Sequence, residues 1–515
     1  MKNLAEKVFL SMDPPTEEDP RSCQQRVCEA LAVCGYPNAR IPLRTLQRLY
    51  ANCLAGEYRI TATLVRCSED WVAVATEPGD TRGSLYGLAV DYGSTTIVMQ
   101  LVDLNTGAVA AQASEANGQR QYGTDILTRI TCVLGDPARA DDLQRATAET
   151  FNRLLARLTT ETGVSARDCP VMVVSGNTSM IHFLLKLNAW TVFASPFAPV
   201  TTRPDWLRGD ELGLDFPGMV FIIPSASNYI GGDIVSGLLT IDLQKKAEIG
   251  LFFDIGTNGE LVIGNREWLL AGAGAAGPAL EGYISRYGVR AQPGAIDSVA
   301  IRGAVLSATT IGNRPPIGIC GSGIIDLLAQ MRLNGWINIA GELNPDASPR
   351  IRWLEDSSEY AVVYADAAES GLGVPLSFSQ TDIRQYLETK AAAYTMVDCL
   401  LELAGCRIDD VAHCYLSGAF SAHSNLESAI TIGMFPDLPR DRFSCIANSS
   451  LDGARTLLLN RDRLEDVRFL TERLYCVQFA SIPDFTVRMH AAKFIPHTDM
   501  HRFPSVAARL RSAAL

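Results

Sequence analysis

The chain has 515 residues, 47% hydrophobic and 20% charged, and its 45 basic and 57 acidic side chains give a net charge of −12. This length predicts about three folding units, and the composition excludes wholesale disorder. The acidic balance argues against nucleic-acid binding. No apolar stretch approaches the roughly 18 residues of a membrane helix, and Glu6 and Asp13 come too early for a secretion signal. We expect a cytoplasmic protein that binds neither nucleic acid nor membrane.

Residues 1–84 precede the main body of the chain. Residues 1–40 contain a Pro- and acid-rich linker segment and then an amphipathic helix. Residues 41–84 contain one helical stretch and two strand-like runs, YRITATLV and WVAVAT, which predict a small α+β domain. From residue 85 onward, short apolar strands alternate with helical patterns, which is typical of an α/β architecture.

Thirteen cysteines leave reduced thiols, a metal site or core packing as alternatives, because disulfide frameworks belong to short secreted chains. No Cys-x-x-Cys pair occurs, which excludes most zinc sites. Cys23, Cys28, Cys34 and Cys53 form the only grouping, but its spacing departs from that of a plant-type 2Fe–2S site. Cys23 and Cys28 lie in a helix-like stretch, so we expect them to pack and expect no iron–sulfur cluster in this chain.

One internal similarity dominates the sequence. Residues 87–102 read GLAVDYGSTTIVMQLV, and residues 250–263 read GLFFDIGTNGELVI. Each has an apolar strand, then Asp-x-Gly and two small polar residues, and then a second apolar strand. A single copy is typical of an ordinary β-turn. Two copies in matching contexts favour a pair of hairpins with one shared ligand.

Small residues in a tight turn expose successive backbone N–H groups, which form an anion-binding nest. Asp91 and Asp254 would repel a phosphate unless a cation lay between, and Mg²⁺, held largely through water, suits such ligands. We therefore predict polyphosphate binding, with these two carboxylates as the catalytic and metal-binding groups. The predicted phosphate-binding residues are Gly93, Ser94, Thr95, Thr96, Gly256, Thr257 and Asn258.

Three further glycine-containing segments attract attention. Residues 272–277 spell G-x-G-x-x-G, but Asp297 precedes an apolar run instead of ending a strand, so close backbone approach is favoured over dinucleotide binding. Gly321, Ser322 and Gly323 precede an apolar helix, whose N-terminus favours anions, although a simple helix start is the alternative. Gly418 and Ala419 follow an apolar strand, where a nucleoside can lie on the backbone.

The order of these motifs resembles the acetate and sugar kinase, chaperone and actin (ASKHA) superfamily. Nearly the whole chain resembles the ATP-dependent reductive activators of corrinoid proteins. The segments that carry the resemblance are VFLSMDPPTEEDPRS (8–22), VDYGSTT (90–96), YGTDILTRI (122–130), VSGNTSMIHFLL (174–185), FDIGTNGELV (253–262), AGPALEG (276–282), GICGSGIID (318–326), SGAFSAHSNLESAITIGMFPD (417–437) and FIPH (494–497).

The resemblance implies a two-lobe, actin-like ATPase core with ribonuclease-H-like subdomains, lobe I at 85–247 and lobe II at 248–515. It implies ATP and Mg²⁺ as cofactors. The hairpin residues would form the two phosphate motifs, and Gly418 and Ala419 the adenosine motif. The implied activity is ATP-driven reduction of a Co(II) corrinoid protein, the partner, to the Co(I) nucleophile of a methyltransferase system.

The sequence also departs from the family. Members commonly carry an N-terminal 2Fe–2S ferredoxin domain, and this chain begins where that domain would end. Ser421 replaces a usual Gly, and Arg286-Tyr287 replace a common Cys-Gly pair. We therefore expect a separate ferredoxin-like electron donor, and we keep a homodimer as a candidate assembly.

Two other functions stay open at this point. One is a nucleotide-gated binding protein, chaperone-like or filament-forming, without a redox role. The other is a small-molecule kinase, which needs a general base near the γ-phosphate. Asp125, Asp233 and Glu260 lie near key motifs, but none stands out as that base.

Overall fold

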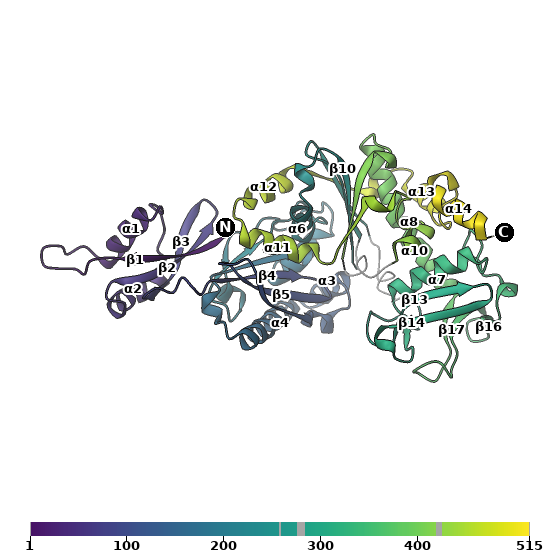
Figure 1. The fold of residues 1–515 in the computed structure, drawn as a ribbon, viewed down its shortest axis with the longest axis horizontal. Helices are drawn as coiled ribbons and strands as arrows, with labels where there is room; N and C mark the ends of the chain where they lie inside the picture. Colours follow the sequence, from purple (N-terminus) through teal and green to yellow (C-terminus); the bar gives the residue numbers. More distant parts are fainter. Residues whose placement is uncertain (1, 257–258, 275–283, 419–424, 514–515) are drawn as a thin grey trace. The chain divides into compact units, whose positions relative to one another are not determined.

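The computed structural model describes residues 2–513, apart from 257–258, 275–283 and 419–424. The chain divides into two compact units, which are described one at a time (Figure 1). The first comprises residues 1–242 and 449–473, and the second comprises residues 243–448 and 474–515. Across the described ranges, no helix is long and apolar enough to span a membrane.

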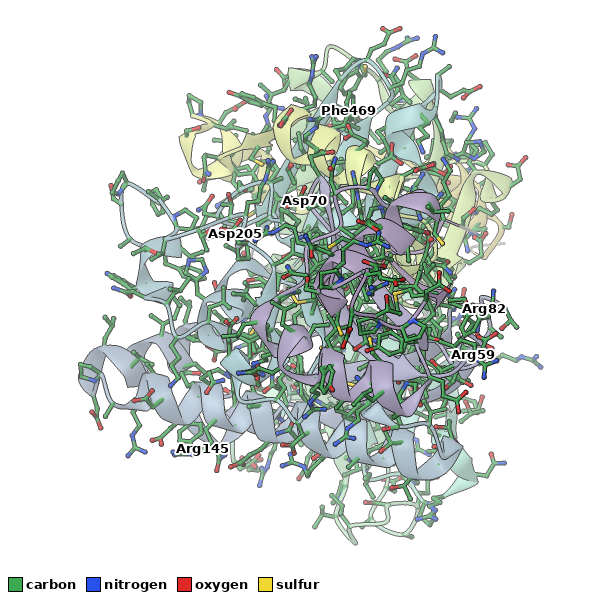
Figure 2. The ribbon with its side chains drawn as sticks, turned by 90° about the vertical axis from the view of Figure 1, so that its left-hand side faces the viewer. Arg59, Asp70, Arg82, Arg145, Asp205 and Phe469 are labelled. Carbon is green, nitrogen blue, oxygen red and sulfur yellow. The ribbon has the colours of Figure 1, made fainter. Side chains whose placement is uncertain are left out.

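The first unit begins with a small α+β domain. Its antiparallel sheet has the order β1-β2-β3, formed by β1 (Ala5–Ser11), β2 (Arg59–Cys67) and β3 (Asp70–Pro78). Arg59 and Asp70, both labelled in Figure 2, lie at opposite ends of the β2–β3 pair. Two helices, α1 (Cys23–Val33) and α2 (Leu43–Ala55), bury Val27, Leu31, Leu49 and Cys53 against it. The helices and the two strands expected in residues 21–78 are confirmed, and residues 5–11 add a strand.

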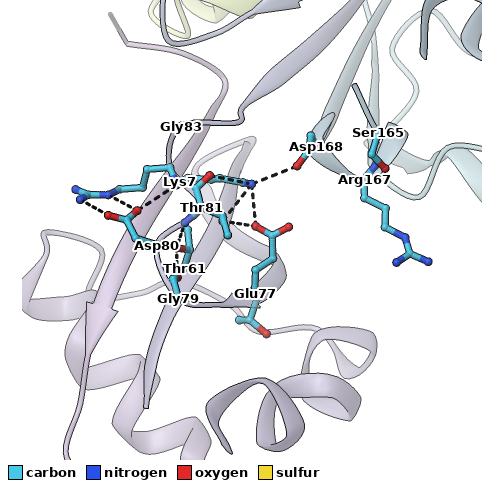
Figure 3. A network of polar contacts seen from close by, with 12 residues as sticks. Lys7, Thr61, Glu77, Gly79, Asp80, Thr81, Gly83, Ser165, Arg167 and Asp168 are labelled. Carbon is cyan, nitrogen blue, oxygen red and sulfur yellow. Dashed lines mark hydrogen bonds and ion pairs between the residues drawn. The ribbon is translucent and has the colours of Figure 1, made fainter. Parts of the chain in front are cut away.

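A buried lysine joins this domain to the rest of the first unit (Figure 3). The Lys7 side chain is 2% exposed and lies 2.8 Å from Glu77 and 3.6 Å from Asp168. Its ammonium group also donates to the hydroxyl of Thr81 at 3.3 Å. Because a buried charge is costly without partners, this network favours one docked position of the domain.

The larger sheet of the first unit has the order β6-β5-β4-β7-β9-β8. Its first three strands are antiparallel, and β7 and β9 run parallel to β4. The strands are β4 (Tyr86–Tyr92), β5 (Thr96–Asp103), β6 (Val109–Ala116), β7 (Val171–Gly176), β8 (Leu207–Arg208) and β9 (Met219–Ile222). The central strands are almost wholly apolar because helices cover both faces of the sheet.

Six helices complete the first unit. Helix α4 packs against β5 and β6. Helices α6 and α11 pack together on the other face, next to β4 and β7 (Figure 1). The helices are α3 (Ile126–Gly135), α4 (Arg139–Thr162), α5 (Thr178–Leu184), α6 (Gly232–Ile241), α11 (Ser449–Leu459) and α12 (Arg463–Arg473). The last two come from residues 449–473, so the chain returns to this unit from within the range expected for lobe II.

The second unit repeats the same arrangement. Its six-stranded sheet has the order β20-β19-β10-β11-β12-β21. Again the first three strands along the chain are antiparallel, and β19 runs parallel to β10. The strands are β10 (Ile249–Ile255), β11 (Gly259–Gly264), β12 (Leu269–Gly274), β19 (Val411–Ser417), β20 (Phe443–Ile446) and β21 (Leu474–Val477). The two predicted hairpins are therefore confirmed as β4–β5 and β10–β11, in equivalent places of two equivalent sheets.

Besides the large sheet, the described residues of the second unit form two three-stranded sheets and five α-helices. One small sheet contains β13 (Ala295–Arg302), β14 (Val305–Thr310) and β15 (Gly318–Ile319), and the other contains β16 (Ile351–Leu354), β17 (Glu359–Ala365) and β18 (Leu376–Ser379). The helices are α7 (Gly321–Leu333), α8 (Gln380–Leu403), α10 (Leu426–Thr431), α13 (Phe485–Ala492) and α14 (Pro504–Ala513). A single apolar core connects these elements.

Candidate nucleotide-binding site

The first predicted phosphate hairpin is a tight turn between β4 and β5. Gly93, Ser94 and Thr95 form the turn, half-buried, and Thr96 begins β5. A Cβ atom at Gly93 would lie 2.5 Å from the carbonyl oxygen of Thr96, so only glycine fits without a backbone shift. The Asn117 amide donates to the Gly93 carbonyl at 2.9 Å. The turn is therefore held in one shape with its small residues within reach of solvent, as an anion nest requires.

Asp91 lies beside this turn, near the end of β4, in a polar cluster. The hydroxyl of Ser450, at the start of α11, donates to its carboxylate at 2.8 Å. The Ser175 hydroxyl on β7 lies 2.9 Å from that of Ser450 and donates to the Gly232 carbonyl at 3.2 Å. Ser175 is fully buried and Ser450 is nearly so. The cluster therefore joins two strands and the first turns of two helices.

A second carboxylate, that of Asp233 in the first turn of α6, lies close enough to Asp91 for the two charges to interact. Burial, together with the neighbouring Asp91 carboxylate, raises the pKa of Asp233 to about 6. At Gly231 a Cβ atom would lie 2.6 Å from the Asp233 carboxylate, so a glycine at this position leaves room for the Asp233 side chain. Mg²⁺ is typically held by one or two carboxylates together with phosphate and water, and a cation relieves the repulsion between the carboxylates. The Asp91–Asp233 pair therefore fits a divalent cation.

The second unit contains an equivalent arrangement around Asp254. Asp254, near the end of β10, is opposite Glu260 on β11 and Ser417 on β19. Glu260 is 8% exposed. Gly256 follows in an exposed position, and Thr257 and Asn258 lie outside the described residues. Gly418 has a φ of 95°, a conformation that favours glycine, and Ala419 lies outside the described residues.

A Ser-Gly pair accompanies each hairpin, and the sequence reasoning missed this second repeat. Ser175 pairs with Asp91 across β7 and β4, and Gly176 follows it. Ser417 pairs with Asp254 across β19 and β10, and Gly418 follows it. The available signal was an apolar strand ending in Ser-Gly, which occurs in both MVVSG and CYLSG. Each unit thus presents a small hydroxyl beside its aspartate.

The remaining predicted glycines pack closely against neighbouring backbone or side chains. Gly321, Ser322 and Gly323 form the first turn of α7 and are buried, and a Cβ atom at Gly323 would lie 2.4 Å from the Ile296 carbonyl oxygen. This close packing explains Gly323, and a ligand role for the turn stays a prediction. Gly272 and Gly274 lie within β12, where Cβ atoms would collide with Phe479 and Met396. A dinucleotide fingerprint places its glycines after the strand, so packing is the better explanation.

The three carboxylates considered as a kinase base have different surroundings. Asp125 caps α3 by accepting from the Thr128 N–H at 2.8 Å. Asp233 interacts electrostatically with Asp91, and Glu260 is opposite Asp254.

Of the four N-terminal cysteines, Cys53 is buried and Cys23 packs against the core of the small domain, whereas Cys34 is exposed. Within the described ranges, no three His, Cys, Asp or Glu side chains could together hold a metal ion.

Each of the two units has an aspartate at a strand end, a small-residue hairpin and a neighbouring Ser-Gly, which is the repeated arrangement expected of an ASKHA-type core. Three family models match the chain in order: the RACo linker region at 1–83, the RACo middle region at 86–246, and the C-terminal domain of RACo, the ASKHA domain, at 248–507. The chain belongs to the RACo family. The expected α/β architecture with an ASKHA domain is thereby confirmed.

Individual relatives agree with this assignment. A solved reductive activator for corrinoid, iron–sulfur protein superposes with a TM-score of 0.88 at 35% identity, covering 98% of this chain and 81% of that one. The corrinoid activation enzyme RamQ of Eubacterium limosum is 29% identical over 410 residues, 78% of this chain and 69% of RamQ. A Co(II) methylated amine-specific corrinoid protein reductase of Methanosarcina barkeri is 24% identical over 277 residues, 50% of this chain and 47% of the reductase.

Proposed function

We propose that this protein uses ATP to drive the reduction of a corrinoid protein from Co(II) to Co(I) in a methyltransferase system. The main observation behind this proposal is an arrangement that occurs twice in a chain of the RACo family: an aspartate, a hairpin and a neighbouring Ser-Gly. Relatives named for corrinoid activation and for Co(II) corrinoid protein reduction support the same reading. The proposal places the protein in the cytoplasm, with a separate ferredoxin-like electron donor and a homodimeric assembly.

The proposal assigns each group a task. Gly93, Ser94, Thr95 and Thr96 bind one part of the polyphosphate through backbone N–H groups and hydroxyls. Gly256, Thr257 and Asn258 bind another part, and Gly418 and Ala419 contact the adenosine. Asp91 and Asp233 would hold Mg²⁺, which neutralises phosphate charge when bound. Asp254 stays a predicted catalytic and Mg²⁺-binding carboxylate of the second hairpin, acting through water. Ser450 and Ser175 keep the Asp91 carboxylate oriented.

The energetic requirement is modest. A tenfold change in a one-electron equilibrium equals about 59 mV, or about 1.4 kcal/mol. If ATP binding and turnover bias the complex with the corrinoid protein by roughly 4 kcal/mol, the reduction becomes easier by roughly 170 mV. Such a bias needs only a difference in affinity between two states of the complex, and no phosphoryl transfer to the partner.

The first test is ATP hydrolysis by the purified protein with Mg²⁺, with and without a matched Co(II) corrinoid protein and reductant. We expect stimulation by the corrinoid protein and loss of hydrolysis in Asp254→Ala. Asp346→Ala, at an exposed position in the same unit, should behave as wild type. Wild-type hydrolysis in Asp254→Ala would refute the site, and the absence of corrinoid stimulation would refute the function.

A further inference from the structure

The buried face of α3 carries an arginine with neutral acceptors. Arg129 is fully buried. Its guanidinium donates to the carbonyl oxygens of Ser94 at 2.7 Å and Gly123 at 3.0 Å, and to the Gln119 side-chain oxygen at 3.3 Å. Every oxygen acceptor that the described residues give this guanidinium is therefore uncharged. A guanidinium with only neutral acceptors is unusual at this position, behind the first predicted phosphate hairpin.

The arginine is held rigidly from behind. Gln119 is itself fully buried, and its amide donates to the Thr147 hydroxyl at 2.7 Å. The Tyr92 hydroxyl lies 2.8 Å from the same Thr147 hydroxyl. The guanidinium is therefore fixed in direction, and its strongest contact with the hairpin is the bond to the Ser94 carbonyl.

A buried guanidinium without a carboxylate partner is energetically costly, by several kcal/mol. Burial lowers the pKa of Arg129, while the Tyr92 and Asp125 side chains act to raise it and the Arg120 charge acts to lower it. An arginine nevertheless stays protonated in a protein. The positive charge is therefore present whether or not a ligand is bound, and the guanidinium contacts the hairpin directly through the Ser94 carbonyl.

We propose that Arg129 is a positioning residue for the first phosphate hairpin. It fixes the Ser94 carbonyl, so that the N–H groups of the turn point to the phosphate, and bound phosphate supplies the missing countercharge. The inference rests on the proposed function because it takes ATP as the ligand. It predicts a contribution to affinity that depends on the phosphates and not on the nucleoside.

The test compares ATP, ADP and adenosine binding to wild type, Arg129→Gln and Arg129→Lys with Mg²⁺. Calorimetry measures the nucleotides, and ligand-observed NMR at millimolar concentration measures adenosine. We expect Arg129→Gln to weaken ATP and ADP binding at least about tenfold, the effect of one lost charge-assisted contact, with adenosine within about twofold of wild type. Arg129→Lys keeps the positive charge but loses the forked N–H donors of the guanidinium. Its loss of ATP and ADP affinity should therefore be smaller than that of Arg129→Gln.

Arg145→Gln is the matched control. Arg145 is an arginine of the same unit on α4 (Figure 2). Its side chain is 60% exposed and paired with Asp142. It should bind all three ligands as wild type does. Unchanged ATP binding in Arg129→Gln would overturn the proposal, and so would an equal loss for ATP and adenosine, the mark of a purely structural role. If Arg129→Gln does not fold, the same comparison is made with Arg129→Lys. Wild type that binds no ATP would instead refute the proposed function.

Discussion

The hydroxyl of Ser450 donates a 2.8 Å hydrogen bond to the carboxylate of Asp91, a residue 359 positions earlier in the chain. The contact exists because residues 449–473 return to the first unit, where α11 packs against β4, β7 and α6. The proposed magnesium ligand thus depends on a helix that lies, in sequence, deep within the RACo C-terminal region. Mutation of Ser450 tests the orientation of the Asp91 carboxylate separately from the chemistry of that carboxylate.

Ser450→Ala should weaken catalysis without unfolding the protein. A hydrogen bond to a charged group contributes about 1.5–3 kcal/mol, so we expect hydrolysis of ATP to fall at least about tenfold. Steady-state assays over a range of Mg²⁺ concentrations measure this. Ser444→Ala, at an exposed position, serves as the control. Equal rates for the two variants would show that Ser450 does not orient Asp91.

Asp233→Asn should weaken the affinity of the protein for Mg²⁺. Removing one of two interacting carboxylates removes a proposed metal ligand, but it also removes the charge repulsion between them. We expect the Mg²⁺ concentration for half-maximal ATPase activity to rise by about tenfold or more, with the ligand-free protein at least as stable as wild type. Metal titrations measure the Mg²⁺ requirement, and urea unfolding measures the stability of the ligand-free protein. A destabilised variant with unchanged Mg²⁺ dependence would contradict the assignment.

Lys390 should be a major stabilising residue of the second unit. Its side chain is fully buried in α8, and the ammonium group donates to the carbonyl oxygens of Ala492, Phe494 and Pro496. Lys390→Met leaves these carbonyls unpaired, so we expect the free energy of unfolding to fall by about 3 kcal/mol. Lys493→Met, which breaks only the partly exposed pair with Glu388, should cost less than about 1 kcal/mol. Equal urea midpoints for the two variants would rule this out.

His497 should make the protein sensitive to acid. Burial, with the nearby Arg502 and Lys390 charges, lowers the pKa of His497 to about 4, and its Nδ1 accepts from the Asp499 N–H at 2.9 Å. The unfolded chain takes up a proton near pH 6.5 and the folded protein only near pH 4, so stability falls as the pH drops through this window, by on the order of 3 kcal/mol.

Unfolding measured between pH 7 and pH 4 tests this prediction. His497→Gln should lose less stability over this range than wild type, because its side chain does not titrate. His501→Gln, at an exposed position, should follow the wild-type curve. A His497→Gln curve parallel to wild type would mean that other groups account for the acid sensitivity.

The hairpins could be predicted from the sequence because their signals are local. An apolar strand, Asp-x-Gly and a second apolar strand determine β4–β5 and β10–β11 without reference to the rest of the chain. Ser450, Arg129 and Asp233 could not be assigned in this way, because their partners lie on other elements and only packing brings them together. Gly272 illustrates the opposite problem, since a glycine required beside Phe479 reproduces part of a nucleotide-binding motif.

The central proposal is tested most directly by the visible absorption spectrum of a matched Co(II) corrinoid protein held with a ferredoxin-like donor at a fixed potential. With wild type, Mg²⁺ and ATP, we expect Co(I) to accumulate. Without ATP, or with Asp91→Asn, the spectrum should stay that of Co(II). Co(I) formation at the same rate and extent without ATP would contradict ATP-driven reductive activation, and so would its absence with wild type and ATP.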